Sequence, residues 1–539
     1  MGDAREDEGR RGDLAFGTTP RLVALAAAAF GDAPFVEDGP ARVTFAELPS
    51  RVRDVARALL ARGVGPGDRV AVWAPNRLEW VLAALGVHAA GGVLVPINTR
   101  FKGHEARYVL AQSRARLLFT IGSFLGADYP AMLRDDTGGA TLDPALDLVL
   151  LDGDERPGAL AWGAFLAGGA AIDDATSDAR AAAVRPDDLS DLIFTSGTTG
   201  HPKGVMCTHG QTLRAFRDWA DVVGLRAGDR YLVVLPFFHS FGYKAGWLAC
   251  LMMGATVLPQ AVFDVPEVLA RVARDRVSVL PGPPALYQSI LAHPGRAAFD
   301  LGNLRLAVTG AAAIPVDLVR RMKGELGFDT VITGYGLTEA TGVSAMCREG
   351  DDAETIATTS GRAIPGVEIR VVDDDGAEVA RGETGELCVR GYAVMKGYFA
   401  DEAATRAAID AEGFLHTGDV GTMDTRGYVR ITDRKKDMFI VGGLNAYPAE
   451  IEGVLLAHED VARVAVVGMP DERLGEVGCA FVVPRAGLAP TAEALIAFCR
   501  ARMANYKVPR RVEIVADLPA NATGKVLKYV LRDRAKGLA

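Results

Sequence analysis

The chain has 539 residues, of which 49% are hydrophobic and 24% charged, and this length exceeds what one hydrophobic core usually serves. The composition therefore predicts a globular protein of two or more domains and excludes a disordered chain. The 59 basic and 68 acidic residues give a net charge of −9, which excludes a nucleic-acid binder that depends on neutralising phosphates, so a bound anion must meet a local positive site.

The six cysteines show no paired spacing and no accompanying histidines. This scatter argues against a disulfide framework or a zinc site and favours the reducing cytoplasm as the location. Residues 1–18 begin with a dense run of charges and lack the apolar core of a signal peptide, so we expect a disordered tail. The longest apolar stretches, 81–97 and 246–258, are too short or too interrupted to span a membrane.

Helical and strand patterns alternate along the first third of the chain. Apolar residues recur at helical spacing over 48–62 and 80–90, and the apolar runs at 68–75 and 91–97 are typical of short buried strands. This alternation predicts an α/β domain with a largely parallel sheet. The stretch 152–183, rich in Ala, Gly and Asp, is expected to form surface loop and helix.

The most informative stretch is 194–205, Phe-Thr-Ser-Gly-Thr-Thr-Gly-His-Pro-Lys-Gly-Val, which follows an apolar strand pattern. Its glycines let the backbone turn N–H groups inward, its hydroxyls donate hydrogen bonds, and its lysine adds a mobile positive charge, so we expect a phosphate-binding loop. It differs from a Walker loop, because Gly204 follows the lysine and Pro202 precludes the helix start. The alternative is a flexible polar linker. The candidate ligands are Thr195, Ser196, Gly197, Thr198, Thr199, Gly200 and Lys203.

An aromatic cluster follows the strand pattern at 231–236. It contains Phe238, Phe241 and Tyr243 around His239, and Lys244 comes next. A histidine beside aromatic residues is more often a packed core residue than a functional one. Lys244 could reach a polar group of a substrate, but a solvated lysine is the commoner case, and we expect that here.

Two further strand patterns, at 275–281 and 304–310, frame a helix pattern at 285–291. The second strand ends in the small residues Gly310, Ala311 and Ala312. Small side chains at the carboxyl end of a strand allow a flat ligand to lie against the backbone, at the edge where open α/β sheets bind ligands. The alternative is close packing of a helix on the strand.

Polar motifs continue to the end of the chain. Thr330-Val-Ile-Thr-Gly-Tyr-Gly-Leu-Thr-Glu339 combines a strand pattern with a tyrosine between two glycines. Thr417-Gly-Asp419 would usually be a turn, and the charge run at 433–437 would usually be a linker. The stretch 437–539 resembles a small α+β domain, with strand patterns at 461–468 and 478–484, and Thr523-Gly-Lys525 is a weak signal by itself.

Taken in order, these motifs resemble those of the adenylate-forming enzymes, which include acyl-CoA synthetases, luciferases and the adenylation domains of peptide synthetases. The resemblance covers about residues 20–535. It implies a large N-terminal domain of packed α/β layers at 19–435 and a small mobile α+β domain at 436–539, which pivots at Lys436. Family members often carry an amide two residues before Tyr335, where this chain has Thr333, so that polar contact is in doubt.

The resemblance also implies roles for individual residues. Tyr335 would offer its ring to adenine, Asp419 would bind the ribose hydroxyls, and Glu339 would hold the Mg²⁺ that accompanies ATP. The implied catalytic residues are Lys525, His239, Thr338 and Glu339. The remaining implied nucleotide-binding and CoA-binding residues are Gly310, Ala311, Ala312, Arg434, Gly442 and Gly443. The implied acyl pocket comprises Phe238, Phe241, Gly242, Tyr243, Gly334 and Gly336.

The implied reaction joins a carboxylic acid to ATP, giving an acyl-adenylate and pyrophosphate, and then transfers the acyl group to the thiol of coenzyme A. The stretches 236–246, 279–284 and 345–348 look like those of actinobacterial ligases for the bicyclic propanoate left after degradation of steroid A and B rings. We therefore expect a bulky alicyclic, steroid-derived, terpenoid or fatty acid, for which the small residues at 310–313 with Gly334 and Gly342 would leave room.

Other functions of the same fold stay open. The chain could pass its adenylate to an amine, or perform only one half-reaction. A non-catalytic acyl-nucleotide binder is a different class, but it would need neither Lys525 nor Glu339. The sequence does not determine the oligomeric state, and a homodimer is left open.

Overall fold

The computed structural model describes residues 17–134, 145–153, 156–195, 202–310, 314–435, 437–441, 444–471, 474–503, 505–520 and 526–538. The chain divides into two compact units. The first comprises residues 1–357, 363–367 and 390–415, and the second comprises 358–362, 368–389 and 416–539. The sequence predicts a domain boundary between residues 435 and 436, with a pivot at Lys436, and both stay predictions.

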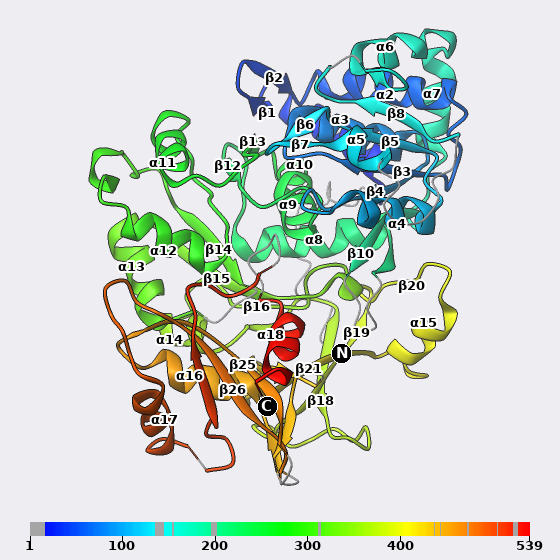
Figure 1. Ribbon diagram of the computed structural model, residues 1–539. Coiled ribbons are helices and arrows are strands. Elements are labelled where there is room, and N and C mark those ends of the chain that lie inside the picture. The colour runs from blue at the N-terminus through cyan, green and yellow to red at the C-terminus, as the bar shows by residue number, and fades with distance from the viewer. Residues whose placement is uncertain are drawn as a thin grey trace. The chain divides into compact units, whose positions relative to one another are not determined.

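The first unit contains an eight-stranded sheet in the order β20-β11-β10-β4-β3-β5-β8-β9 (Figure 1). The strands from β10 to β9 are parallel, whereas β11 and β20 are antiparallel to their neighbours. Strands such as β4 and β5 are buried on both faces, which is why the sequence shows them as continuous apolar runs. The bounds are β3 Arg69–Trp73, β4 Val93–Pro96, β5 Leu117–Thr120, β8 Asp147–Leu150, β9 Leu160–Ala161, β10 Leu189–Thr195, β11 Lys203–Thr208 and β20 Gly397–Tyr398.

A second sheet region of this unit joins strands from distant parts of the chain. Its strands run β12-β13-β1-β2 and β14-β15-β16-β17, where β17 is Arg362–Ala363, and Val279 bridges the two sets through Tyr231 and Leu306. The strand predicted at 275–281 is therefore wrong in extent, because only Val279 forms β-bridges there, although the N–H groups of Ser278 and Leu280 also donate to carbonyls of β12 and β14. The bounds are β1 Pro34–Asp38, β2 Ala41–Thr44, β12 Arg230–Val233, β13 Thr256–Pro259, β14 Leu306–Gly310, β15 Thr330–Tyr335 and β16 Ala345–Met346; the short hairpin β6 Ser123–Phe124 and β7 Ala127–Asp128 stands apart.

Helices of the first unit confirm the periodic patterns. The predicted helices at 48–62, 80–90 and 285–291 are α2, α3 and α12. Every residue of α3 except Glu79 is buried. Such burial is typical of a helix whose own side chains are apolar on every face. The bounds are α1 Thr19–Phe30, α2 Leu48–Ala61, α3 Leu78–Ala89, α4 Gly103–Ser113, α5 Tyr129–Arg134, α6 Trp162–Ala167, η2 Gly168–Ala171, α7 Asp174–Ala182, α8 His209–Val223, α9 Ser240–Gly242, η3 Tyr243–Leu248, α10 Ala249–Met253, α11 Val265–Arg274, α12 Pro284–Ala292, η4 Arg296–Ala298, α13 Val316–Leu326, η5 Thr338–Ala340 and α15 Glu402–Ala408.

The second unit contains the stretch 437–539, for which the sequence predicts a small α+β domain, and it also includes residues 358–362, 368–389 and those from 416 onward. It has one sheet in the order β18-β19-β21-β22 and another in the order β24-β23-β26-β25, with β27 beside β26. The strands predicted at 461–468 and 478–484 are confirmed as β25 and β26, and a core around Ile451, Leu455 and Phe481 holds this sheet. The bounds are β18 Val367–Val372, β19 Gly385–Gly391, β21 Leu415–Met423, β22 Val429–Arg434, β23 Phe439–Val441, β24 Leu444–Ala446, α16 Pro448–Leu456, β25 Val461–Asp471, β26 Gly475–Pro484, α17 Ala492–Arg500, β27 Arg511–Ile514 and α18 Lys528–Lys536. The helix α14, Ala353–Thr358, belongs to the first unit except for its last residue.

All six cysteines are buried as free thiols. Burial raises the pKa of Cys207, Cys479 and Cys499 to about 11, so these thiols stay protonated at neutral pH. Over the described ranges, no helix combines the length and apolar character needed to cross a membrane.

A buried ion pair lies at the centre of the first unit. Lys244 Nζ, from η3, is 2.9 Å from Asp191 Oδ1 of β10, and neither side chain has any solvent exposure. The expectation of a solvated Lys244 is therefore wrong. Burial alone would lower the pKa of Lys244, but the Asp191 carboxylate and the Cys207 thiol outweigh it, and the pKa is raised.

Polar groups from several elements surround this pair. Asp191 Oδ2 accepts hydrogen bonds from the hydroxyls of Ser190 at 2.7 Å and Thr212 at 3.4 Å. His88 of α3 is fully buried beside them, and burial lowers its pKa to about 4, so its imidazole is neutral at pH 7. The ion pair is thus the only charge-bearing part of a polar cluster that joins β10, η3, α3 and α8 within the described residues.

We expect Lys244→Met to destabilise the protein by about 3–5 kcal/mol, because Asp191 would be left as a buried, uncompensated charge. The double variant Lys244→Met/Asp191→Asn removes both charges and keeps their approximate shapes, so it should regain most of the lost stability. Thermal unfolding midpoints of the native chain, the single variant and the double variant measure this. A double variant as unstable as Lys244→Met would contradict the importance of charge pairing.

Candidate functional site

The predicted phosphate loop connects the two strands of a hairpin. β10 and β11 pair antiparallel, and Thr195 at the end of β10 lies opposite Lys203 at the start of β11. Residues 196–201, which include Ser196, Gly197, Thr198, Thr199 and Gly200, lie outside the described residues. The two ends of the loop are therefore fixed by the sheet itself, and Thr195 and Lys203 are both half-buried there.

Glu339 meets this hairpin from a distant part of the chain. It lies in η5, the short turn that follows β15, and its Oε1 accepts a hydrogen bond from Thr195 Oγ1 at 3.2 Å across 144 positions of sequence. Thr338 precedes it in the same turn and is half-buried. The structure thus brings together the predicted phosphate-binding threonine and the predicted metal-binding carboxylate.

Tyr398 completes this group, and the sequence interpretation missed it. Its hydroxyl donates to Glu339 Oε1 at 3.1 Å, and the ammonium of Lys203 lies 5.1 Å from the centre of its ring. The tyrosine belongs to the edge strand β20, which pairs with β11. A Gly-Tyr dipeptide before a charged helix carries no local signal of this contact, so only the strand pairing could have revealed it.

The carboxyl ends of β14 and β15 lie side by side near the start of this turn. Gly310 pairs with Gly334 in the parallel ladder, and the half-buried Tyr335 follows. Carboxyl ends of parallel strands are where open α/β sheets bind ligands, as the sequence predicted for these residues. Ala311 and Ala312 lie outside the described part of the chain.

Several glycines of the predicted pocket are required by protein packing. A Cβ at Gly310 would lie 2.7 Å from the Gly334 carbonyl oxygen, and one at Gly336 would lie 2.3 Å from that of Gly342. A Cβ at Gly242 would meet the Pro236 carbonyl oxygen at 2.2 Å. Protein backbone already occupies this space, so these positions do not provide the room for substrate that the sequence suggested.

Gly334 and Gly342 differ from those positions. A Cβ at Gly334 would make only ordinary contacts, at 3.4 Å from the nearest atoms. Gly342 has φ of +113°, a conformation that side chains rarely adopt, so its backbone requires glycine irrespective of space. Among the described glycines of the predicted acyl pocket, Gly334 is the one beside which a ligand would find space.

The aromatic segment after β12 is partly core. Tyr243 is fully buried and stacks on Trp247 with ring centres 4.9 Å apart, so it packs in the core with Trp80. His239 is exposed, and its Nδ1 accepts a hydrogen bond from the Phe241 N–H at 3.2 Å, which caps α9. Phe238 is buried and Phe241 is half-buried. His239 and Phe241 are therefore the members of this segment that a ligand could reach.

The remaining predicted residues belong to the second unit. Asp419 of β21 is buried, and it lies opposite Arg434 in the ladder between β21 and β22. Its N–H donates to Thr417 Oγ1 at 3.0 Å, which shapes the Thr-Gly-Asp segment. The side chain of Arg434 and residues Lys436, Gly442, Gly443 and Lys525 lie outside what the structure describes.

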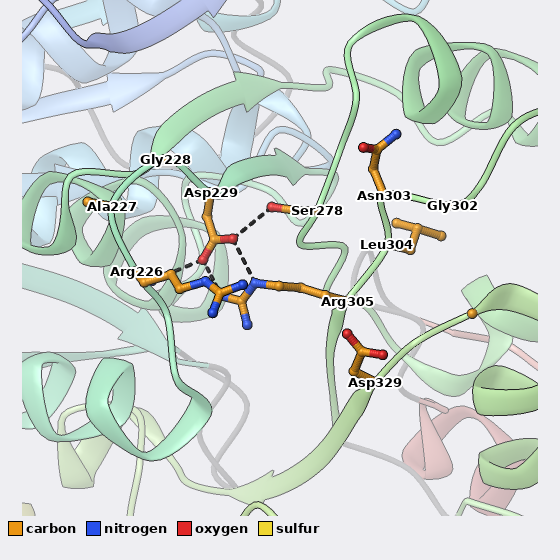
Figure 2. Close-up of a pocket in the computed structure, with 11 residues that line it drawn as sticks. Arg226, Ala227, Gly228, Asp229, Ser278, Gly302, Asn303, Leu304, Arg305 and Asp329 are labelled. Carbon is orange, nitrogen blue, oxygen red and sulfur yellow. Dashed lines mark hydrogen bonds and ion pairs between the residues drawn. The ribbon is translucent and has the colours of Figure 1, made fainter.

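A cavity of about 530 Å³ lies at the opposite edge of the second sheet region (Figure 2). Its residues Asp229, Arg305 and Asp329 directly precede β12, β14 and β15, so it opens at the amino ends of these strands. Asp229 is held by Arg305 Nε at 2.8 Å and by the Ser278 hydroxyl at 2.9 Å (Figure 2). The central charges of this cavity therefore neutralise each other, and we do not consider it the candidate site.

The arrangement of Thr195, Lys203 and Glu339 suits an anion bound together with a divalent metal. A hydroxyl and an ammonium can bind phosphate oxygens, while a carboxylate can share a metal ion with them. Because one carboxylate alone holds a metal weakly, the phosphates would supply the other ligands.

Comparison with known families agrees with this interpretation. Residues 23–399 match the family described as AMP-binding enzyme, and residues 450–525 match the AMP-binding enzyme C-terminal domain. The first match contains all residues of the candidate site in the first unit, and the second ends at Lys525.

Individual proteins resemble the chain over nearly its whole length. A 3-[(3aS,4S,7aS)-7a-methyl-1,5-dioxo-octahydro-1H-inden-4-yl]propanoyl:CoA ligase from Rhodococcus jostii is 52% identical over 96% of this chain and 99% of its own. A ligase of the same name from Mycobacterium tuberculosis is 51% identical over 91% of this chain and 94% of its own. The solved anthranilate CoA ligase AuaEII in complex with anthranoyl-AMP has a TM-score of 0.85 and 28% identity, covering 97% of this chain and 98% of its own.

We expect Gly336→Ala to lower the unfolding midpoint and weaken ATP binding, because its Cβ would displace the turn that carries Thr338 and Glu339. Overpacking of this kind typically costs about 1–3 kcal/mol. Gly334→Ala is the matched control, two residues away, and should keep both the midpoint and ATP affinity. Thermal unfolding and calorimetric titration with ATP test this, and equal behaviour of the two variants would refute the packing argument.

Proposed function

The chain belongs to the AMP-binding enzyme family and is an ATP-dependent acyl-CoA ligase, and we propose that its acid is a bulky, alicyclic propanoate. The observation that carries the substrate proposal is the identity of 52% to a ligase named for a saturated bicyclic acid, a dioxo-octahydroindenyl propanoate, over almost the full length of both chains. ATP, coenzyme A and the acid are then the three substrates. We keep the cytoplasm as the proposed location.

In the first half-reaction two anions must approach each other, since a carboxylate attacks the α-phosphate of ATP. We propose that Thr195 and Lys203, at the two ends of the hairpin loop, bind the triphosphate together with the loop residues between them. Lys525 would bridge the carboxylate and the α-phosphate and stabilise the charge that develops there. Thr338 would donate to a phosphate oxygen from the turn after β15.

The site fits a magnesium ion through Glu339. Mg²⁺ in nucleotide sites is usually held by one or two carboxylates and by the substrate phosphates, and Glu339 provides one half-buried carboxylate beside the hairpin. When bound, the ion would neutralise negative charge on the triphosphate. The task of the protein is to hold the Glu339 carboxylate in a fixed orientation toward it.

For the adenosine part, we propose that Tyr335 packs against adenine beside Gly310, at the carboxyl ends of β15 and β14. Asp419 and Arg434, which lie opposite each other in β21 and β22, would bind the ribose and phosphate of the nucleotide. A carboxylate has two oxygens and can accept hydrogen bonds from both ribose hydroxyls.

In the second half-reaction the thiol of coenzyme A needs access to the acyl-adenylate. We propose that a pivot at Lys436 withdraws Lys525 and that Gly442 and Gly443 line the channel for pantetheine. Glycine suits such a wall, because a Cβ would narrow it. On the acid side, Phe241 and His239 are the accessible residues of the aromatic segment, and Phe238 supports them from the core.

We expect the purified chain to release pyrophosphate with bicyclic alicyclic propanoates at a kcat/KM at least about 10-fold above that with ferulate or octanoate, as pocket fit usually allows. Addition of coenzyme A should convert the adenylate to a thioester. Pyrophosphate release across an acid panel, with thioester detection by mass spectrometry, measures both steps. A preference for a flat aromatic or linear acid would overturn the proposed substrate class, and amide formation with added amines but no thioester would favour an amide-forming ligase.

Lys525→Ala should reduce adenylate formation by at least about 100-fold, the usual effect of removing one group that stabilises transition-state charge. Thioester formation from supplied acyl-adenylate should stay within a few-fold of the native rate, because that step needs the lysine withdrawn. The two half-reactions are assayed separately by pyrophosphate release and by thioester yield. An equal loss in both assays would exclude the proposed role.

A further inference from the structure

The segment 390–399 is bound along the hairpin that carries the phosphate loop. Its strand β20 pairs with β11, and the N–H groups of Lys396 and Phe399 donate to the carbonyls of Met206 at 2.9 Å and Gly204 at 2.7 Å. The N–H of Met395 donates to the main-chain carbonyl of Glu339 at 2.8 Å. This segment therefore contacts both the hairpin and the turn that holds the candidate metal ligand.

Tyr398 makes the side-chain part of this contact. Its hydroxyl and that of Thr195 donate to the same oxygen of Glu339, Oε1, at 3.1 Å and 3.2 Å. Among the described residues no donor binds the other oxygen, Oε2. Two donors on one oxygen prevent the carboxylate from rotating and leave its second oxygen to a cation.

The ring of Tyr398 has a second contact. The ammonium of Lys203 lies 5.1 Å from its centre, within the range of a cation–π interaction. One residue thus orients both the phosphate-binding lysine and the metal-binding carboxylate.

We propose that Tyr398 is a positioning residue that, together with Thr195, holds Oε1 of Glu339 so that Oε2 binds the divalent metal of the ATP complex. The inference rests on the proposed function, since it requires metal and ATP to bind beside Glu339. It adds a specific way in which the protein presents one carboxylate oxygen before the nucleotide arrives. Groups that orient a metal ligand typically change metal affinity by about 10- to 100-fold when they are removed.

Tyr392, six positions earlier in the same segment, provides a matched control. Its hydroxyl donates to Asp218 Oδ2 at 2.8 Å, and the guanidinium of Arg214 lies 4.0 Å from its ring centre. It therefore anchors the segment by a tyrosine–carboxylate hydrogen bond of the same kind, but to α8 and not to Glu339. The variant Tyr392→Phe therefore measures the effect of weaker anchoring of this segment, without removing a hydrogen bond to Glu339.

The test is the Mg²⁺ dependence of binding of a non-hydrolysable ATP analogue, measured by titration calorimetry on the full chain. Tyr398→Phe removes the hydroxyl and keeps the ring under Lys203, so the Mg²⁺ concentration for half-maximal binding should rise about 10-fold. Tyr392→Phe should leave that concentration unchanged even if its unfolding midpoint falls.

The outcomes separate the inference from the proposed function. If the native chain binds the analogue with Mg²⁺ but Tyr398→Phe has the native Mg²⁺ dependence, the positioning role is wrong and the proposed function stands. An equal rise in Tyr392→Phe and Tyr398→Phe would also overturn the inference, because anchoring of the segment would explain both. If the native chain does not bind the analogue at any Mg²⁺ concentration, the proposed function itself fails. Unfolding midpoints of all variants verify that each one is folded under the conditions of the titration.

Discussion

The ion pair between Lys244 and Asp191 is the constraint on which the first unit depends. Two opposite charges without solvent exposure are stable only while they face each other, so the elements that carry them keep a fixed spacing. Asp191 lies in the strand that ends at Thr195, and Lys244 lies directly after the aromatic segment at His239. A single interaction in the core therefore sets the spacing between the proposed phosphate-binding hairpin and the proposed acid-binding segment.

The carboxylate of Glu339 is organised by parts of the chain that are far apart in sequence. Thr195 comes from a strand end, Glu339 from a turn after another sheet, and Tyr398 from an edge strand added to the hairpin. Such a group exists before any substrate binds, so the energetic cost of orienting it is met by folding and does not weaken nucleotide binding. The two-residue strand β20, at the edge of the eight-stranded sheet, is the element that brings Tyr398 into this group.

Local patterns could be predicted from the sequence, and tertiary partners could not. The hairpin strand before Thr195, the strand ending at Tyr335 and the α+β character of the C-terminal part all follow from apolar runs beside turn residues. The burial of Lys244 cannot be predicted locally because its partner Asp191 lies on a strand distant in sequence, and the contact of Tyr398 depends on strand pairing. The glycines show a third case. A sequence reveals that a residue is small, but not whether the space beside it is filled by a ligand or by protein backbone. At Gly336 a backbone carbonyl oxygen fills this space.

The burial of all six cysteines has a practical consequence for observing this enzyme at work. Thiol-reactive dyes attack exposed thiolates, whereas the native thiols are shielded and, at Cys207, Cys479 and Cys499, have pKa values raised to about 11. We therefore expect the natural chain to react only slowly with maleimide labels, even when all its cysteines are kept. A single new surface cysteine would therefore take up a fluorophore at one chosen position, without competition from the native thiols.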